Sequence, residues 1–127
     1  MDLFSAIFAI IIFFGIINVW FFRSSRSTLY RGGESKTLKE EFEAYGYPPY
    51  FFYLIGILKL TFSSLLLFGL KFPELTLYGA SGMVVLMLGA IASHVKVSDP
   101  VKKSIPAIVM LFMSGFLLGT ELRDFLF

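Results

Sequence analysis

The sequence predicts an all-α integral membrane protein, a single membrane domain over residues 1–127 that forms a four-helix bundle with a short amphipathic interfacial helix in its first loop. Apolar residues make up 57% of the chain and charged residues only 16%, too few to cover a soluble domain. Four apolar stretches follow one another, each near the ~20 residues that cross a hydrocarbon core. Since the later connections are short, neighbouring helices should run antiparallel.

The predicted spanning helices cover residues 3–22, 50–70, 75–95 and 105–124. The first has no charged residue and lacks the basic start and cleavage site of a signal peptide, so we interpret it as a retained membrane helix. The second is apolar except for Lys59, and the third contains only His94, near its end. The fourth is uncharged until Glu121, and Pro106 falls near its start, where a proline is tolerated.

A short helix is predicted over residues 37–45 of the first loop. Thr37 can cap its start, and Glu40, three residues later, completes a capping box. Leu38, Phe42 and Tyr45 then share one face. We expect this helix to lie on the cytoplasmic membrane surface. The alternative is an ordinary solvated loop.

Glycine, proline and aspartate residues mark further boundaries. Gly46 should end the short helix, and Pro48 and Pro49 suit the start of the next one, where a missing N–H costs little. Asp99 is predicted to cap a short turn that Pro100 opens.

Lysine and arginine residues are unevenly distributed over the connections. The first and third connections hold Arg23, Arg26, Arg31, Lys36, Lys39, Lys96, Lys102 and Lys103. The opposite side has only Lys71 and Arg123. Because positively charged loops stay in the cytoplasm, we expect loops one and three there and both termini outside, in a plasma membrane or bacterial inner membrane.

Lys59 is the most informative single residue. Gly56, Lys59 and Ser63 share a helix face, and small residues mark contact with protein rather than lipid, so Lys59 should point inward. A lysine at mid-membrane costs about 2.5–3.5 kcal/mol. It can snorkel into a wet crevice, bind an anionic or carbonyl-bearing ligand, titrate, or form a structural ion pair, for which Glu121 is the best candidate partner.

His94 and Asn18 lie at similar depth near the cytoplasmic boundary, and Asp99 is close in sequence. We interpret His94 as a structural residue, with a ligand-binding or proton-relay role as the alternative. With one histidine and no cysteine, the chain cannot form a bis-histidine haem, a disulfide or a cysteine-held metal site. Lys59, Asn18 and His94 would line a slot between helices if the protein binds a quinone or another lipophilic molecule.

Several classes of function find no support in the sequence. No phosphate-binding loop, nucleophile elbow, zinc-protease motif or paired-carboxylate constellation is present. The net charge of +2 is too small to suggest nucleic acid as a partner. We therefore favour a protein without catalysis of its own and leave an enzymatic role open.

Several ordered blocks give the chain a resemblance to the DoxX-like family of small membrane proteins. They are Glu41-Phe42 with Tyr45-Gly46-Tyr47-Pro48, Ile55-Gly56-Ile57-Leu58-Lys59-Leu60, Leu65-Leu66-Leu67-Phe68-Gly69, Tyr78-Gly79-Ala80-Ser81-Gly82, and Leu88-Gly89-Ala90-Ile91-Ala92-Ser93-His94 followed by Ser98-Asp99-Pro100. The resemblance implies a compact four-helix bundle. The family takes its name from subunits of a membrane thiosulfate:quinone oxidoreductase, and a related animal protein assists acetylcholine receptor assembly. Some relatives carry an acidic residue at the position of Lys59.

Three functions follow as hypotheses. The first is an accessory or assembly factor for a membrane protein partner, or a homo-oligomer, motivated by small-residue faces such as Gly115-x-x-x-Gly119. The second is a subunit of a membrane oxidoreductase that binds a quinone or other lipophilic molecule without covalent attachment. The third, a small multidrug exporter, ranks last because the first helix contains no carboxylate.

Overall fold

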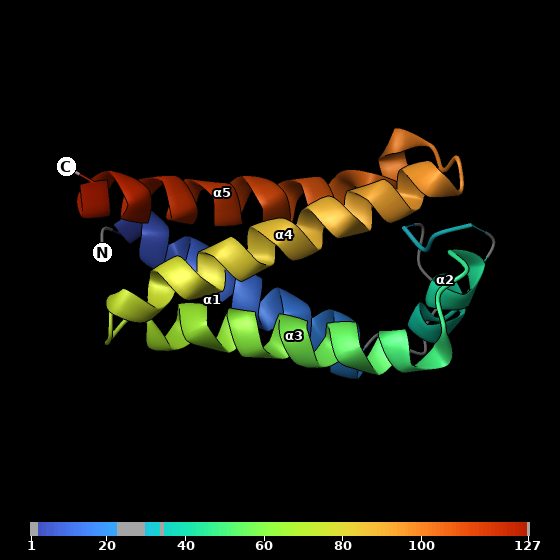
Figure 1. Cartoon of the computed structure of the whole chain (residues 1–127), viewed down its shortest axis with the longest axis horizontal. Coiled ribbons are helices and arrows are strands. Elements are labelled where there is room, and N and C mark those ends of the chain that lie inside the picture. Colours follow the sequence, from blue (N-terminus) through green and yellow to red (C-terminus); the bar gives the residue numbers. More distant parts are fainter. Residues whose placement is uncertain (1–2, 23–29, 34, 127) are drawn as a thin grey trace.

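The structure is a computed structural model that describes residues 3–22, 30–33 and 35–126, and its long helices pack as a bundle (Figure 1). In chain order the elements are α1 (Leu3–Ile17), its π-helical continuation η1 (Asn18–Phe22), α2 (Leu38–Ala44), α3 (Pro49–Phe68), α4 (Glu74–Lys96), the 3-10 turn η2 (Val101–Ser104) and α5 (Ile105–Leu126). Four helical segments are long and apolar enough to cross a membrane. The predicted all-α membrane bundle is confirmed, and the helix ends lie close to the predicted ones.

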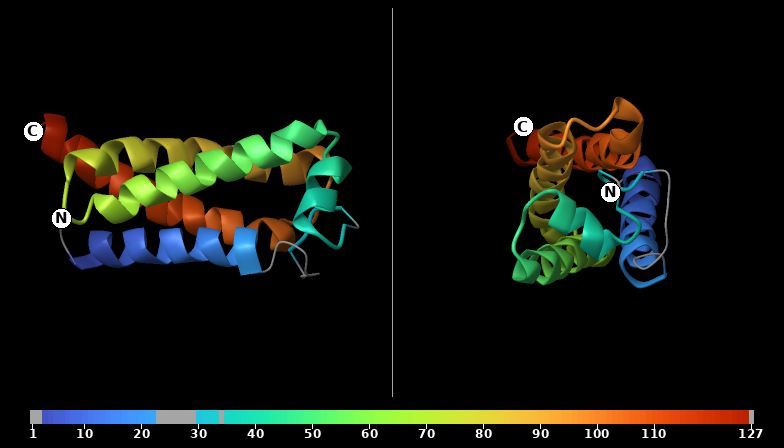
Figure 2. Two further views of the ribbon diagram at one scale, coloured as in Figure 1. Left: turned by 90° about the horizontal axis from the view of Figure 1, so that it is seen from below. Right: turned by 90° about the vertical axis from the view of Figure 1, so that its right-hand side faces the viewer.

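The long helices pack in the ring order α1, α3, α4, α5, with α5 closing back on α1. Both described chain ends lie at one end of the bundle, and α2 lies across the other (Figures 1 and 2). The connection between α4 and α5 shares the end covered by α2, so the first and third loops lie together, as predicted. The side of the membrane that this end faces stays a prediction.

The bundle core is apolar and tightly packed where glycines allow close approach. Ala9, Ile12 and Ile16 of α1 repeat at helical spacing and meet the buried methionines and leucines of α3, α4 and α5. A Cβ added at Gly82 would overlap the Phe62 ring, so this glycine lets α3 and α4 approach. Large apolar side chains cover much of the outer surface, as expected where lipid is the solvent.

The predicted short helix is present as α2. The Thr37 hydroxyl accepts a hydrogen bond from the Glu40 N–H at 3.1 Å and so caps it. The capping box is only half formed, because the Glu40 carboxylate accepts from the N–H of Lys36 rather than of Thr37. Gly46 ends the helix in the left-handed region at φ 84°, which lets the Tyr47 N–H return to the Phe42 carbonyl.

The apolar face of α2 is turned towards the protein. Leu38, Phe42 and Tyr45 are buried. Their face packs over the end of the bundle, so α2 covers that end as a cap helix. Its place at the membrane surface stays a prediction.

Asp99 does not cap the following turn, contrary to the prediction. Pro100 holds the N-cap position of η2, and no side chain caps that turn. The reason lies at the end of α4, where Ser98 is left-handed at φ 59° and the Asp99 N–H returns to the His94 carbonyl at 3.0 Å. This chain reversal turns the Asp99 side chain back towards α4.

Candidate functional site

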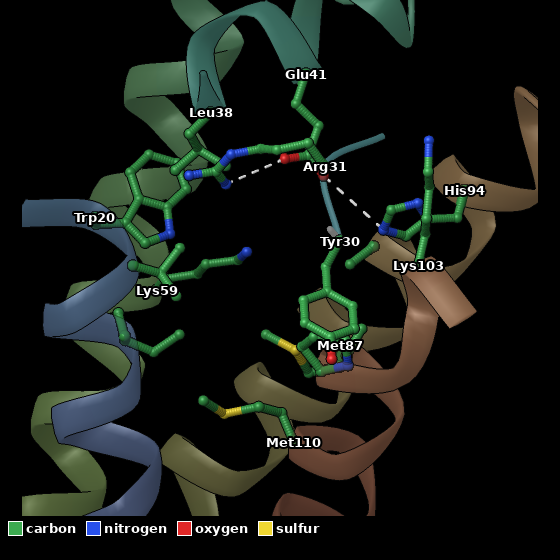
Figure 3. Close-up of a pocket in the computed structure, with 15 residues that line it drawn as sticks. Trp20, Tyr30, Arg31, Leu38, Glu41, Lys59, Met87, His94, Lys103 and Met110 are labelled. Carbon is green, nitrogen blue, oxygen red and sulfur yellow. Dashed lines mark hydrogen bonds and ion pairs between the residues drawn. The ribbon is translucent and has the colours of Figure 1, made fainter. Parts of the chain in front are cut away.

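A cavity of about 270 Å³ lies beneath α2, at the covered end of the bundle (Figure 3). Its sides come from α1, η1, α3, α4 and α5, and its roof from α2 and residues 30–31. Ile16, Met87 and Met110 make its lower part apolar, while Lys59 extends into it from α3. The inward orientation predicted for Lys59 is therefore the one observed.

A second cavity of about 270 Å³ adjoins the first on the side between α3 and α4. The two share the lining residues Leu38, Glu41, Lys59, Ala90 and His94. The second cavity is also lined by Val85, whose side chain is 67% exposed on the outside of the bundle. It therefore reaches the surface that lipid covers, between α3 and α4.

Lys59 rests against the only tryptophan of the chain, Trp20. The Lys59 Nζ atom lies 5.4 Å from the Trp20 ring centroid, within the range of a cation–π contact. Trp20 comes four residues after the buried Ile16, is itself partly buried against the core, and packs on Phe52 at 4.9 Å between ring centroids. Gly56 makes this possible, since a Cβ there would lie 2.7 Å from the Trp20 ring.

The Trp20 indole nitrogen, Nε1, is buried and has no hydrogen-bond partner among the described residues. An indole N–H is a donor only, and a buried donor without an acceptor costs about 1–3 kcal/mol. Figure 3 shows this nitrogen on the side of the ring that faces the cavity, near Lys59. Lys59 makes no ion pair with any described carboxylate. Two donors without an acceptor thus face the same space.

Glu41 stands above these donors on α2 and is held by several partners. Its carboxylate lies 3.3 Å from the Arg31 guanidinium, and it accepts a hydrogen bond of 2.6 Å from the Tyr45 hydroxyl. The His94 ring nitrogen Nε2 lies 3.8 Å away. Glu41 and Arg31 are both buried, so each offsets the charge of the other in a poorly solvated place.

His94 lies at the end of α4 and is paired with Asp99. Its Nδ1 atom is 2.8 Å from the Asp99 carboxylate, so Nδ1 carries a proton and donates it. The same carboxylate accepts from the Gly33 N–H at 3.0 Å and lies 3.6 Å from the Lys103 ammonium, which also donates to the Gly33 carbonyl. Asp99 thereby joins residues 30–33 to α4 and η2.

Two groups of this network outside the spanning helices have shifted pKa values. Burial works to raise the pKa of Asp99, but hydrogen bonds from His94 and Gly33, with the charge of Lys103, outweigh it and bring the pKa below its ordinary value. Burial raises the pKa of the Tyr45 hydroxyl, and the Glu41 carboxylate raises it further. Tyr45 therefore stays protonated and acts as a donor.

Several residues predicted for the site lie elsewhere. Asn18 is exposed and lines neither cavity, because it comes two residues after the buried Ile16 and so lies about 200° around the helix. Ser63 is buried but donates to the Leu60 carbonyl of its own helix. Glu121 lines neither cavity and makes no ion pair with Lys59, so the suggested pair is absent.

The residues expected from the sequence leave out several that line the site, Glu41 and Trp20 among them. Glu41 follows Leu38 by three residues and precedes Tyr45 by four, which places it on the buried face of the short helix. Trp20 follows the buried Ile16 by four residues, which indicates the inner side of its helix. Helical spacing was the signal in both cases.

The fold and the cavity define a class, an integral membrane four-helix bundle with an internal cavity under a cap helix. Comparison with family models identifies the group within it: the DoxX-like family matches residues 11–116, and the chain belongs to that family. A search of curated proteins and a search of solved structures both gave no match.

Proposed function

We propose that the protein binds a lipophilic small molecule whose head group accepts hydrogen bonds, within the cavity under α2. The observation that carries this proposal is the pair of donors, Lys59 Nζ and Trp20 Nε1, which face a largely apolar space and have no acceptor among the residues that the structure describes. Ligand sites in proteins typically combine apolar walls with a few convergent polar groups. Quinones meet these requirements, since their carbonyl oxygens accept hydrogen bonds and their tails are apolar.

Three features of the cavity support binding of such a ligand. A carbonyl oxygen within reach of Trp20 Nε1 would recover the hydrogen bond that this buried donor lacks, with a gain of about 1–3 kcal/mol. Met87 and Met110 are flexible and polarizable, so they can adapt to a ring or to methyl groups. A tail can leave past Gly89, where a Cβ would meet nothing within 4 Å, and enter the lipid between α3 and α4.

Intrinsic fluorescence tests the proposal, because Trp20 is the only tryptophan. A short-chain benzoquinone titrated into protein in nanodiscs should quench Trp20 emission to saturation at a molar ratio of one. Lys59→Met should weaken that quenching about tenfold, the equivalent of one polar contact of about 1.4 kcal/mol. Lys71→Met is the matched control, because Lys71 is exposed beyond the end of α3. Unsaturable quenching, or quenching and thermal stability unchanged in Lys59→Met, would remove the proposal.

A role as accessory or assembly factor is the second candidate, and one observation favours it. Gly115 and Gly119 on α5 are exposed, and a Cβ at either position would meet nothing within 4 Å. These glycines thus do not serve packing within the chain, and a face of this kind suits a partner helix in the membrane. Gly115→Leu with Gly119→Leu should abolish copurification of a stoichiometric membrane partner in mild detergent. A protein that purifies alone before and after the change contradicts this role.

A further inference from the structure

We infer that the head group recognised in this cavity is a carboxylate on a single-chain amphiphile, such as a fatty acid. This inference rests on the proposed function above and names its ligand class. It follows from the balance of charges around the cavity, from the number of donors that lack an acceptor, and from the place where the second cavity reaches lipid.

Among the described residues, one positive charge of the cavity lining has no ion-pair partner. Arg31 is paired with Glu41 at 3.3 Å, and Lys103 lies 3.6 Å from Asp99. Lys59 is the remaining lysine of the lining, and among the described residues it has no carboxylate within ion-pair distance. The Trp20 ring faces its ammonium but carries no net charge. A bound anion would compensate the Lys59 ammonium, whereas a neutral quinone leaves that charge uncompensated.

The protein carboxylate nearest to this space is already engaged. Glu41 lines both cavities, but its oxygens interact with Arg31 and with the Tyr45 hydroxyl. The Glu41 carboxylate therefore lies on the α2 side of the cavity that Lys59 enters, but it does not form an ion pair with Lys59. The ligand must bring its own acceptors, and the two oxygens of a carboxylate match the two donors, Lys59 Nζ and Trp20 Nε1.

The apolar remainder of the site selects one extended chain. The second cavity is lined by Phe51, Ile55, Val85 and Leu86, and it reaches the outside of the bundle between α3 and α4. A hydrocarbon chain that leaves by this route stays in apolar surroundings from the head group to the bilayer. Each cavity has a volume of only about 270 Å³, which suits one chain with a small head better than a two-chain phospholipid.

Brominated probes test this inference, because bromine quenches tryptophan on contact and Trp20 is the only tryptophan. The probes carry bromine on the carbon next to the head group, which is the part expected beside Trp20: 2-bromododecanoate, 2-bromododecanol and 2-bromododecyl phosphate, added to protein in zwitterionic nanodiscs. The carboxylate should bind about tenfold or more tightly than the alcohol. That preference should vanish in Lys59→Met, persist in Lys59→Arg, which keeps the charge, and persist in the exposed control Lys71→Met.

Each outcome is decisive. Equal affinity for carboxylate and alcohol in the unaltered protein, or a preference that survives in Lys59→Met, overturns the carboxylate assignment while the proposed binding of lipophilic molecules stands. Tighter binding of the phosphate probe overturns the choice of carboxylate over phosphate. No saturable quenching by any probe or by the benzoquinone overturns both the inference and the proposed function. A loss of preference in Lys59→Arg as well as Lys59→Met shows that folding rather than charge was altered, and it counts against the inference.

Discussion

Alanine at Gly56 and at Gly89 should shift stability in opposite directions, although both glycines lie in spanning helices near the cavities. A Cβ at Gly56 would lie 2.7 and 2.9 Å from two carbons of the Trp20 ring, closer than real Cβ contacts. A Cβ at Gly89 would meet nothing within 4 Å. The pair therefore separates the effect of packing from that of helix propensity.

The magnitudes follow from these two terms. Replacing glycine by alanine inside a helix gains about 0.8–1.0 kcal/mol at either site. At Gly56 the overlap with Trp20 forces a shift of the ring, and overpacking of this kind costs about 1–3 kcal/mol. Gly56→Ala should therefore range from neutral to about 2 kcal/mol less stable. Gly89→Ala should be about 0.8–1.0 kcal/mol more stable.

Unfolding in mixed micelles with increasing SDS, followed by circular dichroism, measures both variants against the unaltered protein. The emission maximum of Trp20 should move in Gly56→Ala and stay constant in Gly89→Ala, because only the first change touches the ring. Equal shifts in unfolding midpoint for the two variants, or an unmoved Trp20 spectrum in Gly56→Ala, would refute the packing of Trp20 on Gly56 and with it the geometry of the cavity.

Three further outcomes follow from the network under α2 and from the charge bias. Glu41→Gln should lower the free energy of unfolding by about 1.5–3 kcal/mol, the value of hydrogen bonds to charged groups, while the exposed Glu40→Gln stays close to the unaltered protein. Because the folded pKa of Asp99 lies below 3.8, its stabilisation is present above about pH 3.8 and is lost as pH falls through the folded pKa. Asp99→Asn should therefore flatten the stability curve in that acidic range, measured by thermal unfolding against pH. The chain has no cysteine, so single cysteines at Lys102 and Glu74 report topology: an impermeant maleimide applied from outside should label only the latter.

The spanning helices were predictable because their signal is local. Length and apolar composition define a membrane helix, and the prolines at residues 48, 49 and 106 lie at helix starts in the structure as the sequence suggests. The capping role of Thr37 was predictable for the same reason, since a cap and its partner N–H are three residues apart.

The site was predictable only in part, because much of it depends on contacts between distant segments. Lys59 and His94 stood out as polar residues in apolar stretches, and both line the cavities. The Asp99 carboxylate was assigned to a local cap, but its strongest contacts include the Gly33 N–H, which lies 66 residues away. No helical period encodes that contact. Glu41 differs from Asp99, because its burial could be predicted from its helical spacing to Leu38. A charged residue is normally expected on the surface, and this expectation favoured the wrong face.

The arrangement of charges also indicates how the cap helix α2 is held over the cavity. Glu41 on the cap helix, Arg31 before it, and Asp99 after α4 form contacts that tie α2 and residues 30–33 to the end of α4 and to η2. Such buried pairs are costly to break. Removing one partner leaves the other charge uncompensated and lowers the free energy of unfolding by about 3–5 kcal/mol. On the α3–α4 side, the Tyr47 and Ser93 hydroxyls form a 2.6 Å hydrogen bond between the residues just before α3 and α4, and within the described residues no ion pair ties α3 to α4 beside Val85. Under the proposed function, a lipophilic ligand would therefore enter from the lipid side, between α3 and α4.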